Sequence, residues 1–151
     1  MDVPPGLLTR IDHVGIACHD LEETAAFYER AFGLRVTHRE TNDEQGVKEA
    51  MLRVSEGVTG ATSVQLLEPT REDSPIARHL ARKGEGVHHV AYGVDDVAAA
   101  LAVLRERGVP LVDETPRHGT QDSAIAFLHP KGAHGVLIEL VQAADPGHAV
   151  G

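Results

Sequence analysis

The segment Ile11-Asp12-His13-Val14-Gly15-Ile16 recurs in the second half of the chain as Val87-His88-His89-Val90-Ala91-Tyr92. In both copies a histidine precedes a valine and then a small residue, and the two histidines are 76 residues apart. A second pair of similar segments, Val64-Gln65-Leu66-Leu67 and Ile138-Glu139-Leu140-Val141, is separated by 74 residues. Because the two spacings are nearly equal, the sequence predicts two copies of one unit in a pseudo-symmetric fold.

Each copy is expected to contain a strand, a helix and three further strands. Asp20 can cap the first helix, and Gly33 can end it in the left-handed conformation. Asp96 takes the same cap position in the second copy, 76 residues after Asp20, and Gly108 ends that helix. The expected strands are 10–17, 34–39, 47–54 and 62–67, with a hairpin turn at 57–60, and then 86–94, 110–113, 124–129 and 135–141.

Apolar residues at helical spacing predict which faces of these helices are buried. They are Leu21, Ala25, Tyr28 and Phe32 in the first helix, Val97, Leu101 and Leu104 in the second, and Ile76, Ala77 and Leu80 in a short linking helix. The predicted class is α+β, with two tandem βαβββ modules forming a cupped, partly closed mixed sheet around a metal-containing cleft. The modules span 8–69 and 86–142, the linking helix spans 70–85, and the whole is one structural domain with loose tails at 1–7 and 143–151.

The composition limits the classes of function. A net charge of −9 argues against a nucleic-acid partner, because the phosphate backbone would repel such a chain. The single cysteine, Cys18, excludes an internal disulfide and indicates a buried structural thiol. The first ten residues lack the pattern of a signal peptide, and no apolar run approaches the roughly 20 residues that span a bilayer. We therefore expect a cytoplasmic protein without a membrane partner.

The repeated polar residues predict a metal site. Neighbouring residues on a strand point to opposite faces, so only one of His88 and His89 can face the cleft. The repeat aligns His89 with His13, and His88 is expected to pack elsewhere. Gln65 and Glu139 interrupt apolar strands, where a polar group without a partner is costly. The expected ligands are therefore His13, Gln65, His89 and Glu139.

Imidazole nitrogens mixed with amide and carboxylate oxygens suit Co²⁺, Mn²⁺, Ni²⁺, Zn²⁺ or Fe²⁺ rather than the thiolate site of structural zinc or the oxygen cage of calcium. Four protein ligands around an octahedral ion leave two positions for a substrate that chelates through two oxygens. Such an ion can stabilise an enolate as it forms. We therefore expect one divalent ion per chain.

Five stretches of the chain resemble the vicinal oxygen chelate superfamily and, within it, the family of methylmalonyl-CoA epimerases. They span about residues 8–142 and are Asp12–Ala17, Val47–Leu52, Val64–Pro69, Gly86–Ala91 and Phe127–Leu140. The combination of Gln65, Glu49 and the segment His129-Pro130-Lys131 is more specific than the superfamily pattern alone.

The resemblance implies an isomerase that interconverts (2R)- and (2S)-methylmalonyl-CoA, with Co²⁺ as the leading metal and a homodimer as the usual assembly. It implies that Glu49 is the catalytic base, and that Glu139 is both a metal ligand and the second acid/base. Removing a proton from one face of a carbon and returning it to the other is most direct with two such groups. The repeat aligns Glu49 with the region of Ser123 and Ala124, so its counterpart is not an acid.

Three alternatives remain open from the sequence. A glyoxalase-type lyase or isomerase shares the fold, the metal and proton transfer, but does not need Glu49. An extradiol-type dioxygenase would hold Fe²⁺ by His13, His89 and Glu139, with Gln65 incidental. A non-catalytic drug-binding protein of the same fold would keep the cleft and lose ligands.

Overall fold

The computed structural model describes residues 7–54 and 62–144. The chain forms two compact units, one of residues 13–89 and one of residues 90–151 together with 1–12. They are called here the 13–89 unit and the 90–151 unit, and the boundary falls within two strands, between Asp12 and His13 and between His89 and Val90. The turn expected at 57–60 and most of the two expected tails lie outside the described residues.

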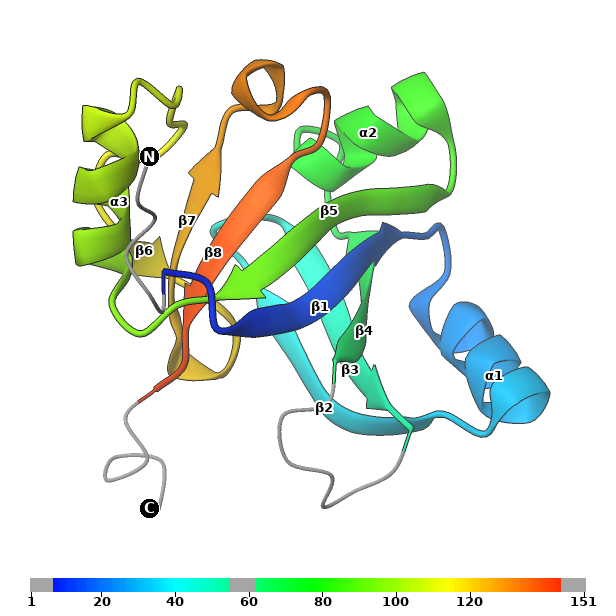
Figure 1. Ribbon diagram of the computed structural model, residues 1–151. Coiled ribbons are helices and arrows are strands. Elements are labelled where there is room, and N and C mark those ends of the chain that lie inside the picture. Colours follow the sequence, from blue (N-terminus) through cyan, green and yellow to red (C-terminus); the bar gives the residue numbers. More distant parts are fainter. Residues whose placement is uncertain (1–6, 55–61, 145–151) are drawn as a thin grey trace. The chain divides into compact units, whose positions relative to one another are not determined.

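In the described part of the 13–89 unit the strand order is β2-β3-β4-β1 (Figure 1), and the first half of β5 also belongs to this unit. Its strands pair antiparallel from β2 to β4, whereas β4 and β1 are parallel. The parallel pair requires a crossover connection, and the chain makes it through α1, β2 and β3 before it enters β4. The elements are β1 (Arg10–Ala17), α1 (Leu21–Phe32), β2 (Arg35–Asn42), β3 (Val47–Arg53), β4 (Ser63–Pro69) and α2 (Pro75–Lys83).

The 90–151 unit repeats this topology in the order β5-β8-β7-β6. Here β5 and β8 are parallel, and β8, β7 and β6 pair antiparallel. The elements are β5 (Gly86–Gly93), α3 (Val97–Glu106), β6 (Arg117–His118), β7 (Ala124–Leu128) and β8 (Ile138–Gln142), with short 3-10 helices at Thr120–Asp122 and Pro130–Ala133. The predicted α+β class with two tandem βαβββ modules is confirmed.

The predicted helix caps are present in both units. The backbone N–H of Glu23 donates to Asp20 Oδ1 over 3.0 Å, and the N–H of Ala99 donates to Asp96 Oδ1 over 3.0 Å. Gly33 adopts a φ of 74°, and its N–H bonds to the last turn of α1. Each cap satisfies a backbone donor or acceptor that the end of a helix leaves open.

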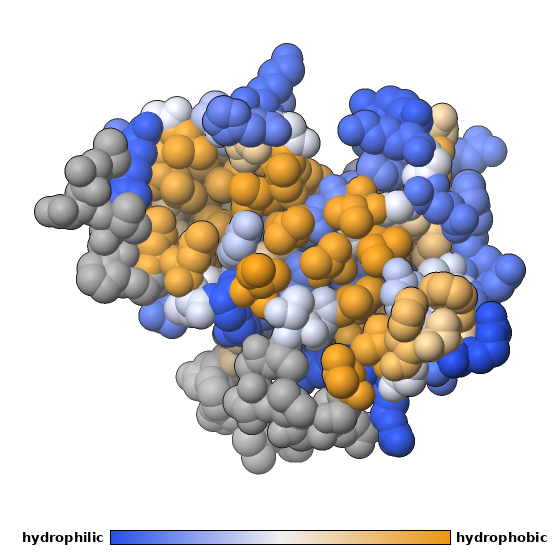
Figure 2. Space-filling model, turned by 45° about the vertical axis from the view of Figure 1, so that its right-hand side comes forward, coloured by the Kyte–Doolittle hydropathy of each residue, from blue (hydrophilic) through white to orange (hydrophobic). Residues whose placement is uncertain are grey.

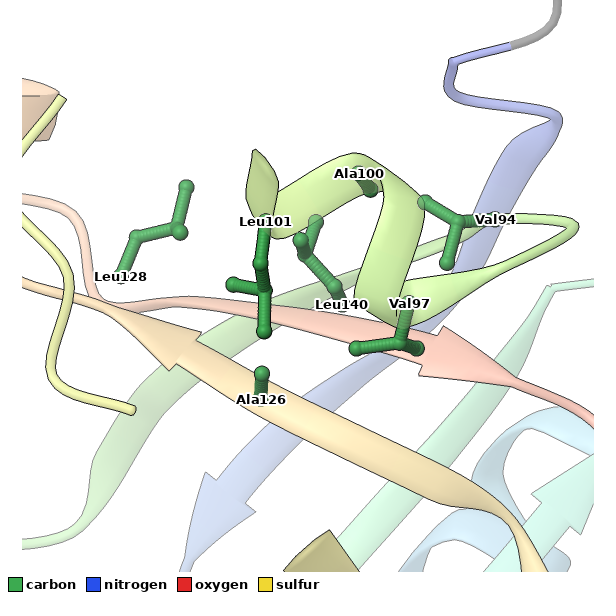
Figure 3. Packing of buried hydrophobic residues seen from close by; sticks show 7 residues of the cluster. All are labelled: Val94, Val97, Ala100, Leu101, Ala126, Leu128 and Leu140. Atoms are coloured by element: carbon green, nitrogen blue, oxygen red, sulfur yellow. The ribbon is translucent and has the colours of Figure 1, made fainter. Parts of the chain in front are cut away.

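Both sheets bury one face beneath their own helix. In the 13–89 unit, α1 packs through Leu21 and Ala25 on the strand residues Ala50, Leu52 and Leu66. In the 90–151 unit, Figure 3 shows α3 above β7 and β8, with Leu101 and Val97 directed at Ala126 and Leu140. Side chains alternate along a strand, so Glu49, Gln65 and Glu139 lie on the face of each sheet that its helix does not cover.

Two predictions about the fold are wrong. Residues 110–113 do not form a strand: Leu111 makes one isolated bridge to Leu128, and β6 begins later, at Arg117. Pro110 lacks a backbone N–H, and the N–H groups of Val112 and Asp113 both donate to one acceptor, the carbonyl of Phe127, so no regular ladder forms.

Phe32, which was expected to be buried, is 67% exposed. The core beneath α1 extends only as far as Tyr28, and Phe32 packs instead on Phe27, with ring centroids 5.7 Å apart. Figure 2 shows further hydrophobic residues at the surface of the face in view. Within the described residues, no helix has the length and apolar character needed to cross a membrane.

Candidate metal and active site

β1 and β5 each contribute one buried histidine to the 13–89 unit. His13 and His89 are both only 4% exposed. Their Nε2 atoms lie 3.1 Å apart, and the two rings are nearly perpendicular, at 86°. The two histidines that the repeat predicted as ligands therefore point their Nε2 atoms toward each other.

Gly15 makes room for the ring of His89. A Cβ at this position would come within 2.7 Å of His89 Nε2 and closer still to Cε1 and Nδ1. Only glycine leaves the space that the imidazole occupies. The counterpart of Gly15 in the repeat is Ala91, so this need exists in one copy alone.

Gln65 and Glu49 form a buried pair on neighbouring strands. Gln65 lies beside Gly15 of β1 and Met51 of β3 in the strand register, and Glu49 pairs with Leu67, two residues after Gln65. The amide Nε2 of Gln65 donates to Glu49 Oε2 over 3.0 Å, and both side chains are at most 5% exposed. Since the nitrogen faces Glu49, the amide oxygen is the atom directed elsewhere.

Glu139 occupies the corresponding position in the 90–151 unit. It is 6% exposed and lies on β8, where it pairs with Ala91 of β5 and Phe127 of β7. Ala91 follows His89 by two residues on the same strand, and residues i and i+2 share a face. The register therefore places Glu139 beside Ala91, the residue of its own unit that the repeat aligns with Gly15.

The strand register corrects the expected counterpart of Glu49. Glu49 pairs with the residue two positions after Gln65, and Ile125 pairs with Val141, two positions after Glu139. Ile125 is therefore the equivalent residue, rather than Ser123 or Ala124. It is buried, at 7% exposed, so an apolar side chain stands where the first copy has a carboxylate.

His88 contacts His89 instead of packing away from it. Its Nδ1 lies 3.0 Å from Nδ1 of His89, and its ring meets the ring of His79, with centroids 5.0 Å apart. Strand parity places the two side chains on opposite faces, which is why the sequence did not indicate this contact. The adjacency of the two histidines was the only available sign of it.

The donors fit a divalent ion with mixed ligands. Two nitrogens that bind one ion at about 2.1 Å and at right angles lie about 3.0 Å apart. The Nε2 atoms of His13 and His89 are 3.1 Å apart. Within the same unit, the amide oxygen of Gln65 is a donor of the kind that Co²⁺, Mn²⁺, Ni²⁺ and Zn²⁺ accept beside imidazole nitrogens.

Comparisons with known proteins agree with this fold. The model of the Glyoxalase/Bleomycin resistance protein/Dioxygenase superfamily matches residues 12–127. The mitochondrial methylmalonyl-CoA epimerase of Homo sapiens is 38% identical over 137 residues, which are 90% of this chain and 75% of that protein.

Two solved structures are closer in sequence. A methylmalonyl-CoA epimerase in complex with methylmalonyl-CoA and NH4+ is 55% identical, with a TM-score of 0.86 over 91% of this chain and 96% of that one. A variant of the Streptomyces coelicolor methylmalonyl-CoA epimerase in complex with 2-nitronate-propionyl-CoA is 54% identical, with a TM-score of 0.86 over 91% and 99%. The chain belongs to the glyoxalase/bleomycin resistance protein/dioxygenase superfamily and, within it, to the methylmalonyl-CoA epimerases, which are isomerases.

Proposed function

We propose that the protein interconverts (2R)- and (2S)-methylmalonyl-CoA by removing the proton at C2 and returning it to the opposite face. The observation that carries the proposal is the buried hydrogen bond between Gln65 and Glu49. It joins a carboxylate to a side chain expected to bind the metal. A base is thereby held beside the point where the substrate oxygens would be bound.

His13, Gln65, His89 and Glu139 are the proposed ligands of one divalent ion, with Co²⁺ first and Mn²⁺, Ni²⁺ or Zn²⁺ as alternatives. When bound, the ion supplies a Lewis acid that stabilises negative charge on the thioester oxygen as C2 loses its proton. Both histidines must be neutral to offer Nε2 lone pairs. Burial of all four side chains keeps water away from the ligands.

Glu49 is the proposed base on one face of C2. Its carboxylate accepts the C2 proton, and the hydrogen bond from Gln65 fixes which way the carboxylate points. Glu139 is the proposed acid that returns a proton on the other face, and the reverse reaction exchanges the two roles. The apolar side chain of Ile125, at the position equivalent to Glu49, leaves Glu139 as the remaining carboxylate of the proposed site.

The Gln65–Glu49 pair also favours this reaction over the two enzymatic alternatives that the sequence left open. A dioxygenase built on His13, His89 and Glu139 would have no use for a buried carboxylate bonded to Gln65. A glyoxalase-type reaction does not need Glu49. Assays of hemithioacetal isomerisation and catechol cleavage should therefore give no turnover with the Co²⁺ or Fe²⁺ protein.

The decisive experiment incubates the Co²⁺-loaded protein with one epimer of methylmalonyl-CoA in deuterated water and follows deuterium at C2 by mass spectrometry. We expect rapid incorporation, loss of incorporation after chelation of the metal, and recovery when Co²⁺ is restored. Absence of incorporation by metal-loaded protein would exclude the epimerase.

Variants of Glu49 and Glu139 test which carboxylate acts on which face of C2. Glu49→Gln can still accept the bond from Gln65, so it should keep Co²⁺ affinity and lose about 10²–10⁴-fold in exchange from one epimer. Glu139→Gln keeps an oxygen ligand and should lose exchange from the other epimer, while the first epimer still exchanges without inverting. Glu106→Gln, an exposed carboxylate on α3, is the control. Equal loss from both epimers in both variants would contradict two bases.

The proposed substrate is a coenzyme A thioester, and the proposed assembly is a homodimer. Light scattering coupled to size-exclusion chromatography measures the assembly directly. A mass near twice 16.2 kDa is expected. A mass of one chain at micromolar concentration would contradict the dimer.

A further inference from the structure

His88 lies against the ring nitrogen of His89 that faces away from His13. The Nε2 of His89 is 3.1 Å from His13 Nε2, while its Nδ1 is 3.0 Å from His88 Nδ1. Both ring nitrogens of His89 therefore have defined neighbours. The rings of His88 and His89 are perpendicular, with centroids 5.2 Å apart.

This arrangement fixes the tautomer of a metal ligand. A neutral imidazole carries one proton, so an Nε2 that binds a metal requires the proton on Nδ1. The Nδ1–H of His89 can then donate to Nδ1 of His88, which accepts with its lone pair. A hydrogen bond of this kind to the distal nitrogen orients a ligating histidine and increases its basicity as a ligand.

We propose that His88 is a positioning residue that holds His89 as the Nδ1–H tautomer, with Nε2 ready to bind the metal. This inference rests on the metal site of the proposed function, but not on the reaction. It also assigns the hydrogen bond between His13 and His89. Nε2 of His89 is the acceptor, so in the metal-free protein Nε2 of His13 carries a proton and donates it. Of the two histidines, His89 is therefore the one whose Nε2 already carries a lone pair instead of a proton before the metal binds.

The ring of His79 also packs on the ring of His88. The two rings meet edge to face at 82°. Burial lowers the pKa of His79 below its ordinary value, and Lys83 and Arg82 lower it further. His79 is therefore neutral at pH 7, and it packs on His88 without adding a positive charge next to the ligand.

The tautomer can be observed without any metal. Nitrogen-15 chemical shifts distinguish Nδ1–H from Nε2–H in a neutral histidine, and the metal-free protein should show His89 as Nδ1–H. His88→Phe keeps a ring against His79 but removes the acceptor, so His89 should become a mixture of tautomers. His88→Asn places its amide oxygen near the position of Nδ1 and should restore the Nδ1–H form.

Metal affinity provides the second readout. Removing the outer partner of a metal-binding histidine costs roughly 10–100-fold in affinity. We expect that loss in Co²⁺ binding for His88→Phe, a clear recovery for His88→Asn, and no loss for the control His38→Phe, a half-buried histidine on β2. Thermal unfolding of the metal-free variants verifies that each one folds.

The outcomes separate this inference from the proposed function. Wild-type affinity in His88→Phe, or His89 as Nε2–H in the wild type, would overturn the role of His88 even if the epimerase is active. Equal losses in the Phe and Asn variants would show a packing role and overturn it as well. If the wild type binds Co²⁺ and His88→Phe weakens binding, but no deuterium enters C2, the inference holds and the epimerase does not.

Discussion

Replacing Gly15 by alanine should displace His89 and disable the metal site. An ordinary van der Waals contact begins at 3.4 Å, whereas the new Cβ would be 2.1 Å from His89 Cε1 and 2.7 Å from Nε2. Because the imidazole ring is rigid, the closest atom sets the displacement, so the ring must move by about 1.3 Å, whereas a functional side chain has to be held within about 0.5 Å of its productive position. Because a misplacement near 1 Å can cost about 10²-fold, we expect Co²⁺ affinity and C2 exchange to fall by roughly that factor.

Calorimetric titration with Co²⁺ and denaturant unfolding of the metal-free protein test this reasoning through a double-mutant cycle. Overpacking should also lower the free energy of unfolding of Gly15→Ala by about 1–3 kcal/mol. If the clash is with the imidazole, adding His89→Ala to Gly15→Ala should recover stability and cost no further metal affinity. Metal affinity near that of the wild type in Gly15→Ala, or a double variant less stable than Gly15→Ala, would refute the argument.

Three further predictions concern the fold. Asp96→Ala should lower the free energy of unfolding by about 1 kcal/mol, because Asp96 accepts from Ala99 N–H, whereas Asp95→Ala, one residue earlier, should have little effect in the same denaturant experiment. Burial raises the pKa of the Cys18 thiol above 9.0, so it should react much more slowly with a thiol reagent in the native protein than after unfolding. The raised pKa also means that this thiol contributes stability below pH 9.0 that is lost as the pH rises through its native value, and Cys18→Ala should reduce that loss.

Much of the fold followed from local chemistry. Asp20 and Asp96 cap their helices, and Gly33 ends the first one, because these residues satisfy backbone groups wherever a helix starts or stops. The spacing of the repeat then predicted that the second copy would have the same strand order. β6 escaped prediction because two residues cannot show an alternating pattern, and Leu111 and Val112 offered a more apolar segment nearby.

The site was harder to predict because its contacts cross strands. The repeat selected His13 and His89, and the structure directs their Nε2 atoms at each other. The bond between Gln65 and Glu49 depends on the register of β3 and β4, which no local pattern encodes. The contact of His88 depends on side-chain rotamers, and parity alone argued against it.

The differences between the two copies bear on the reaction more than their likeness does. The pair Gln65 and Glu139 gives the proposed ligand set one negative charge instead of two, and Glu49, bonded to Gln65, is left to act as a base. Gln65→Glu would make the first copy resemble the second. It would place a carboxylate where an amide now donates to Glu49 over 3.0 Å, and two carboxylates at that distance cannot both be ionised easily.

We therefore expect Gln65→Glu to bind Co²⁺ at least as tightly as the wild type and to exchange the C2 proton at least tenfold more slowly, since Glu49 would then share a proton with the new carboxylate instead of accepting a hydrogen bond from an amide. Gln45→Glu, in the turn before β3, is the matched control and should change neither quantity. If Gln65→Glu exchanged at the wild-type rate, the amide would not be needed to hold Glu49. The asymmetry between the copies would then have no part in moving the proton.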